Sequence, residues 1–106
     1  MPSKVQKILK KLKKELLRIY GEQLDSVILY GSQARGDARE DSDIDVLLIL
    51  KDEFNYIEML KKSDDQVASL SLENDVVISR ALVSKKEYKE RQSPFLINVR
   101  REGVAV

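Results

Sequence analysis

The sequence predicts an α/β (α+β) fold, a small mixed β-sheet flanked by helices, and three observations lead to this class. Near the start of the chain, apolar residues recur at helical spacing among many lysines. Further along, three short runs of Val, Ile and Leu are typical of strands. The chain of 106 residues is 42% hydrophobic and 35% charged, so we expect one domain over residues 1–106 with a strongly solvated surface.

A helix is predicted over residues 3–20. Its apolar positions recur at intervals of three and four residues, which places them on one face: Val5, Ile8, Leu9, Leu12, Leu16 and Tyr20. Lysines fill the opposite face, and Gly21 suits the left-handed backbone just past a helix end.

Strands are predicted over residues 27–30, 44–50 and 75–83. The first ends at Gly31. The second is a nearly unbroken apolar run headed by acids, so we expect both of its faces to be buried. Between the second and third strands, residues 54–72 have helical spacing that residues 63–65 could interrupt.

The last part of the chain is predicted to be helical. Ser84 and Glu87 have the spacing of a capping box, which opens a short helix. Pro94 suits the first turn of another helix, which ends near Gly103. Residues 104–106 form a tail that could pair with an edge of the sheet.

The composition excludes several classes of site. The chain has no Cys and no His, so disulfides, thiolate metal sites and a histidine base are ruled out, and Asp and Glu remain as metal ligands. No apolar run approaches the roughly 20 residues that span a bilayer, and no secretory signal is evident, so we expect no membrane contact and a cytoplasmic location.

The same composition bears on partners. The lysines of the first helix lack interleaved aromatic residues, so we interpret them as a solvated face and do not expect nucleic acid as a partner. A domain this small buries a modest fraction of its surface, which favours a homodimer or a hetero-oligomer.

Two carboxylates mark the start of the second strand. Asp43 and Asp45 are two residues apart, so both point to one face of an extended chain, while Ile44 points to the other. Two carboxylates held so close repel each other unless a cation lies between them, and Mg²⁺ with its oxygen ligands is the common case at phosphoryl sites. A pair of ions about 4 Å apart would stabilise both oxygens of an in-line displacement. Alone, the pair is also consistent with solvated acids at a strand entrance.

Gly31 and Ser32 form the second part of the pattern. They end one strand and begin a short segment that can start a helical turn, where backbone N–H groups favour an anion and glycine permits close approach. By itself this Gly-Ser pair is also consistent with an ordinary tight turn.

Gly-Ser, ten residues, then Asp-x-Asp between two strands resembles the signature of the DNA polymerase beta-like nucleotidyltransferase superfamily. Ala34-Arg35-Gly36 and the run from Ser42 to Asp45 are similar to its minimal branch, the minimal nucleotidyltransferase (MNT) domains, and the likeness extends over nearly the whole chain. The resemblance implies the polymerase beta-like nucleotidyltransferase fold. It also implies a third carboxylate on a neighbouring strand, for which Asp75 is the candidate and Glu73 a weaker one. The alternative is that Asp75 only begins a strand.

The resemblance also implies roles for these residues. Asp43, Asp45 and Asp75 would be catalytic and hold Mg²⁺, as two ions, while Gly31, Ser32 and Arg35 would bind the nucleotide, with ATP as the substrate. Arg35 is expected either near the phosphates or in an ion pair with Asp43 or Asp41.

MNT domains that resemble this chain are commonly encoded beside HEPN-domain ribonucleases and act as antitoxins, some by adding AMP to a tyrosine of the toxin. We therefore expect a Mg²⁺-dependent nucleotidyltransferase that transfers AMP from ATP to a hydroxyl of a HEPN toxin. Three alternatives stay open: an antitoxin that acts by binding alone, a nucleotidyltransferase for a small-molecule alcohol, and a nucleic-acid module that uses the lysine-rich helix.

Overall fold

The computed structural model describes residues 2–39 and 42–106 of the chain. This part forms a four-stranded sheet in the order β3-β2-β1-β4. Strand β2 is antiparallel to β1 and parallel to β3, and β4 is antiparallel to β1, so the sheet is mixed as predicted. The strands are β1 (Leu24–Tyr30), β2 (Ile44–Leu50), β3 (Ile78–Ser84) and β4 (Val104–Ala105).

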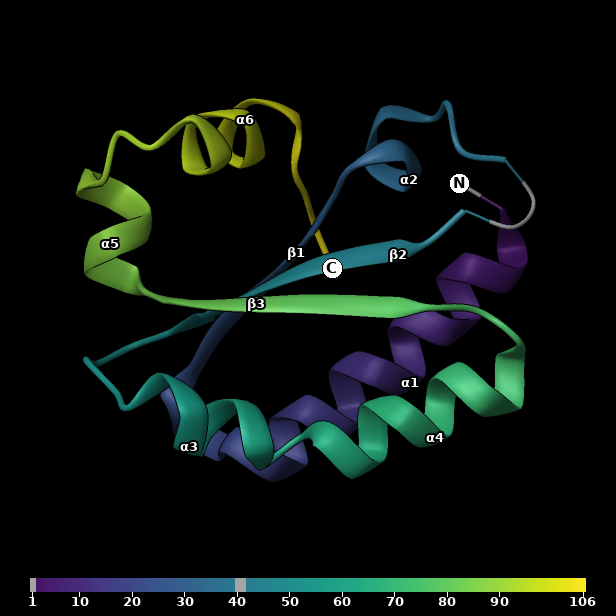
Figure 1. Ribbon diagram of the computed structural model, residues 1–106, viewed down its shortest axis with the longest axis horizontal. Coiled ribbons are helices and arrows are strands. Elements are labelled where there is room, and N and C mark those ends of the chain that lie inside the picture. Colours follow the sequence, from purple (N-terminus) through teal and green to yellow (C-terminus); the bar gives the residue numbers. More distant parts are fainter. Residues whose placement is uncertain (1, 40–41) are drawn as a thin grey trace.

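Helices cover the two faces of the sheet unequally (Figure 1). On the lower face in that view lie α1 (Ser3–Tyr20), α3 (Tyr56–Lys61) and α4 (Asp64–Asn74). On the upper face, α5 (Lys85–Glu90) and α6 (Pro94–Glu102) lie on one side, and the single-turn helix α2 (Ser32–Arg35) lies at the other end of the strands. A 3-10 turn at Gly21–Gln23 joins α1 to β1.

The predicted first helix is confirmed, because α1 buries the six apolar positions expected of it. Its lysines lie on the opposite face, and Gly21 follows with a φ of 58°. No helix among the described residues is both long enough and apolar enough to cross a bilayer.

Strand β2 is buried on both faces, as its apolar run predicts. Ile44, Val46 and Leu48 belong to a core that also contains the apolar face of α1. Leu47 and Ile49 point the other way and pack with residues of α6. Because β2 lies between β1 and β3, its side chains anchor both layers of helices to the sheet.

The predicted helical stretch over residues 54–72 is divided into two helices, and the interruption expected at residues 63–65 is confirmed. The break after Lys61 coincides with a buried contact, in which the Tyr20 hydroxyl donates to Met59 O at 2.6 Å and lies 2.8 Å from Ser63 Oγ. Ser63 is fully buried, so this contact fixes the position at which α4 begins.

The predicted third strand begins later than residue 75. Asp75 is the left-handed residue that ends α4, with φ 51° and ψ 47°, and regular pairing begins at Ile78. The expectation that Asp75 begins this strand is therefore wrong, because a left-handed backbone cannot continue a strand.

The remaining predicted elements are present. Ser84 caps α5 by accepting from Glu87 N at 3.1 Å, and Pro94 lies in the first turn of α6. In the tail, Ala105 pairs with Ile28 and Val104 with Leu29, so the tail extends the sheet at β1 as expected.

Candidate active site

The predicted turn and the predicted acids lie side by side. Tyr30, the last residue of β1, pairs with Asp45 on β2, so Gly31 follows directly beside the carboxylate. A Cβ added at Gly31 would lie 2.5 Å from Asp45 Oδ2. Gly31 also has a φ of 74°, which L side chains rarely adopt. The backbone conformation therefore requires glycine at this position, and a side chain there would displace the Asp45 carboxylate.

The segment after Gly31 folds back as one helical turn. Gly31 O accepts from Ala34 N and Arg35 N, both at 3.1 Å, and Ser32 O accepts from Gly36 N at 3.0 Å. Gln33, which is buried, donates from Nε2 to Ser42 O at 3.4 Å. This contact links the turn to the segment that leads into Asp43, and sequence reasoning did not identify Gln33.

Asp43, Asp45 and Arg35 form one electrostatic group. Burial raises the pKa of Asp45, and the negative charge of Asp43 raises it further, while the positive charge of Arg35 lowers it. Asp45 is half-buried and Asp43 is exposed. The negative charge of Asp43 therefore disfavours ionisation of Asp45, as expected of two acids on one face at the start of β2.

Arg35 holds two carboxylates at the turn. Its Nε lies 3.2 Å from Asp37 Oδ2, and its Nη1 lies 3.4 Å from Glu102 Oε2 on α6. Arg35 was expected either near the phosphates or in an ion pair with Asp43 or Asp41. In the part of the chain that the structure describes, Arg35 pairs with Asp37 and Glu102 instead, and Asp41 lies outside the described residues.

Helix α6 contributes to the site from above. A cleft of about 260 Å³ lies between Gly31 and Arg35 on one side and Phe95, Asn98 and Glu102 of α6 on the other. The Phe95 ring meets Tyr30 edge to face, with the ring centres 5.2 Å apart. These α6 residues were missed from the sequence. Their spacing of three, then four, places them on one helix face, but no local pattern says which part of the sheet that face covers.

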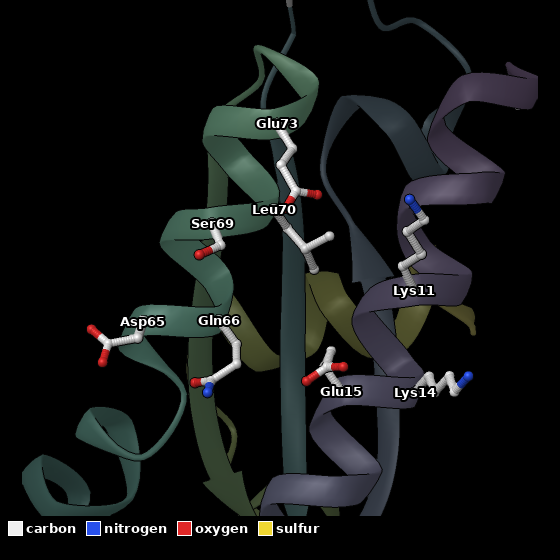
Figure 2. Close-up of a pocket in the computed structure, with 8 residues that line it drawn as sticks. All are labelled: Lys11, Lys14, Glu15, Asp65, Gln66, Ser69, Leu70 and Glu73. Atoms are coloured by element: carbon white, nitrogen blue, oxygen red, sulfur yellow. The ribbon is translucent and has the colours of Figure 1, made fainter.

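Asp75 and Glu73 do not join the acid pair. Asp75 is exposed at the end of α4 and lines a hollow with Leu72 and Val77. Glu73 lies in a groove of about 440 Å³ between α1 and α4, facing Lys11 and Glu15, on the other face of the sheet (Figure 2). Over residues 2–39 and 42–106, no three acidic side chains come together as a metal site. The role of Asp75 as a third ligand stays a prediction without geometric support.

The donor set at Asp43 and Asp45 fits Mg²⁺. Magnesium in phosphoryl-transfer sites is commonly held by one or two carboxylates together with phosphate oxygens and water. Two adjacent carboxylates that repel each other provide such a set, because a divalent cation between them removes the repulsion. The described residues offer no further carboxylate for a second ion at this place.

The geometry of the turn and the acids is accompanied by a match to a family model. Residues 9–103 match the model described as nucleotidyltransferase domain. This chain belongs to that family. The resemblance deduced from the Gly-Ser and Asp-x-Asp motifs is thereby confirmed, and the chain is a nucleotidyltransferase.

Similar proteins extend the comparison. A protein of Methanocaldococcus jannaschii, provisionally named a protein adenylyltransferase, is 38% identical to this nucleotidyltransferase over 99 residues, covering 93% of this chain and 95% of the relative. The protein adenylyltransferase MntA of Thermococcus cleftensis is 31% identical over 80 residues, covering 76% of this chain and 79% of the relative.

Solved structures share the fold. A toxin–antitoxin crystal structure with AMP-PNP aligns at a TM-score of 0.60 and 22% identity, covering 92% of this nucleotidyltransferase and 70% of that chain. A tri-AMPylated HEPN toxin of Shewanella oneidensis in complex with its MNT antitoxin aligns at 0.54 and 22% identity, covering 94% and 69%. The predicted fold class is confirmed by these likenesses.

Proposed function

We propose that this nucleotidyltransferase transfers AMP from ATP to a tyrosine hydroxyl of a HEPN-domain toxin and acts as its antitoxin. The observation that carries the proposal is the contact of the Gly31 turn with Asp45, next to Asp43 and Arg35. The names of the similar proteins, protein adenylyltransferase and MNT antitoxin, support the choice of AMP and of a toxin as acceptor.

The two halves of the site have separate tasks in this proposal. The turn at Gly31 and Ser32 and the guanidinium of Arg35 bind the triphosphate, because they offer N–H groups and positive charge. Asp43 and Asp45 hold Mg²⁺, which supplies neutralisation of the phosphate charge when bound. A cytoplasmic location is part of the proposal, because ATP is the substrate.

In the proposed reaction, the acceptor oxygen forms a bond to the α-phosphorus of ATP, and the bond from this phosphorus to the bridging oxygen of the β-phosphate breaks. Pyrophosphate leaves with the electron pair, and the hydroxyl proton is released. The protein forms no covalent bond, so it acts by positioning the two substrates and by stabilising charge.

The test uses a purified HEPN-domain toxin, with α-labelled ATP and Mg²⁺. We expect label on the toxin, mapped by mass spectrometry to tyrosine, and a loss of its ribonuclease activity. Asp45→Asn should lower transfer by about 100-fold or more, because it removes charge from the metal site. Asp52→Asn, a matched change at an exposed acid beyond the other end of β2, serves as the control. Unlabelled toxin in the presence of wild-type chain would contradict the proposal.

A second candidate is an antitoxin that acts by binding alone. It is favoured by the absence of a third carboxylate beside Asp43 and Asp45 among the described residues. The two candidates differ in their need for ATP. Neutralisation of the toxin without ATP, and unchanged by Asp43→Asn, would select binding alone. Calorimetry of Mg²⁺–ATP binding to the native chain and to Asp43→Asn gives an independent measurement.

A further inference from the structure

The residue that lies beside the acid pair on the β3 side is Val77. Ile44 pairs with Ile78 and Asp45 with Ser79 in the parallel register, and Ile44 N donates to Val77 O at 2.9 Å. One step toward the start of both strands places Val77 next to Asp43.

Val77 points to the same face as the two acids. Its neighbours Val76 and Ile78 pack into the core that contains Ile44, on the face covered by α1 and α4. Successive side chains of an extended segment alternate between faces, so Val77 lies on the opposite face, with Asp43 and Asp45. It is 57% exposed. The side chain beside the carboxylates is therefore apolar and open to solvent.

The acid pair thus has two different flanks, because β2 lies between β1 and β3. On the β1 side are the Gly31 turn and the cation Arg35. On the β3 side are Val77 and Ser79, and β3 itself contains no acidic residue. A triphosphate requires positive charge and N–H donors, and the β1 flank offers both through Arg35 and the Gly31 turn. The β3 flank is left for the acceptor.

We propose that Val77 contacts the acceptor and selects an aromatic hydroxyl, and this inference rests on the proposed function. Strand β3 itself carries no carboxylate that could take the acceptor proton, and Asp75 lies before it, at the end of α4. A phenol, with a pKa of about 10, gives up its proton far more readily than an aliphatic alcohol. The phenol oxygen bonds to the α-phosphorus, pyrophosphate leaves with the electron pair of the broken P–O bond, and the phenol proton passes to water. The apolar Val77 side chain packs against the ring.

The experiment compares Val77→Asn, Val77→Ile and Val77→Asp with the wild-type chain, using the HEPN toxin, α-labelled ATP and Mg²⁺. Ile57→Asn is the matched control, because Ile57 is also 57% exposed but lies on α3, on the other face of the sheet. Circular dichroism verifies folding, which substitutions at exposed positions rarely disturb. N-acetyl-tyrosinamide and N-acetyl-serinamide serve as small acceptors for the selectivity measurement.

Val77→Asn should raise the KM for the toxin by about 3- to 10-fold while the KM for ATP stays within about twofold. Val77→Ile, which keeps a branched apolar side chain, should have a KM for the toxin close to that of the wild-type chain. Val77→Asp, which adds a carboxylate at the acceptor flank, should reduce the preference for the tyrosine probe over the serine probe by about 10-fold.

Equal effects on both KM values, no effect in Val77→Asn, or an unchanged preference in Val77→Asp would overturn the inference. Transfer by the wild-type chain in those cases would leave the proposed function intact. Absence of transfer by the wild-type chain to every acceptor would overturn the proposed function and the inference together.

Discussion

Gly31 is the residue on which the geometry of the site depends, because its missing side chain lets the turn approach Asp45. Gly36 provides a matched comparison. It also has positive φ, 83°, but nothing lies within 4 Å of a Cβ built there. Comparing substitutions at the two positions therefore separates the effect of the contact with Asp45 on stability from the effect of the positive φ.

Gly31→Ala should destabilise the protein by about 2–3 kcal/mol and remove Mg²⁺–ATP binding, because it combines backbone strain with a collision. Gly36→Ala should cost only about 1 kcal/mol, the backbone part. Urea unfolding measures both. Equal costs at the two positions would show that the contact with Asp45 does not constrain residue 31.

Asp45→Asn should stabilise the metal-free protein at neutral pH by a few degrees in Tm. The pKa of Asp45 is raised on folding by burial and by Asp43, so the folded state favours the protonated form. Stability contributed by this group is therefore greatest below the ordinary Asp pKa of about 4 and is lost as the pH rises through the raised value. The Asn side chain does not ionise, so the variant does not lose this stability as the pH rises.

Melting curves of Asp45→Asn and of the wild-type chain in EDTA, from pH 3 to pH 8, measure this difference. The two Tm values should converge at the acidic end and separate above it. A variant that is less stable than wild type at pH 7 would show that the carboxylate stabilises the fold, contrary to its raised pKa.

At the scale of elements, one buried hydroxyl determines how α1 meets the α3–α4 pair. Tyr20 reaches Met59 O and Ser63 Oγ at the break between the two helices, and burial raises the pKa of its hydroxyl. Tyr20→Phe should cost about 1–2 kcal/mol in urea unfolding, because Ser63 stays buried and loses this partner. Tyr56→Phe, at an exposed tyrosine, should have little effect. A small cost at position 20 would mean that the helix break does not depend on this contact.

The elements differ in how far the sequence could predict them. Helix α1, strand β2 and the Ser84 cap follow from local spacing, which is why they were predicted correctly. The interruption expected at residues 63–65 is present, but its contact with Tyr20, 43 residues away, could not be predicted from local spacing. Asp75 precedes an apolar run, as the first residue of a strand would, but its backbone is left-handed and it ends α4 instead.

The residues of the candidate site also differ in how far the sequence could predict their positions. Asp43, Asp45 and Gly31 were found together because two motifs at strand ends imply one sheet edge. The contributions of Phe95 and Glu102 required the placement of α6 over that edge, and the position of Val77 beside Asp43 required the parallel register of β2 and β3.

At the scale of the whole molecule, ligand binding and folding are linked. If Mg²⁺ and nucleotide bind only the folded chain, AMP-PNP with Mg²⁺ at about 100 times its Kd should add about 2.7 kcal/mol to the free energy of unfolding. EDTA should abolish the gain, as should Asp43→Asn, because Mg²⁺ then lacks its pair of carboxylates. Thermal shift with Asp52→Asn as the control measures this. A gain that persists in EDTA would contradict the assignment of metal to the acid pair.

The ion pair of Arg35 with Glu102 joins α2 to α6 across the mouth of the cleft. The guanidinium is already paired with Asp37 and Glu102. If a triphosphate binds at Arg35 as proposed, it has to replace these carboxylates, and loss of the pair with Glu102 would release the tether between the two helices. Nucleotide binding would then leave the last turn of α6, just before β4, without its ion pair to α2.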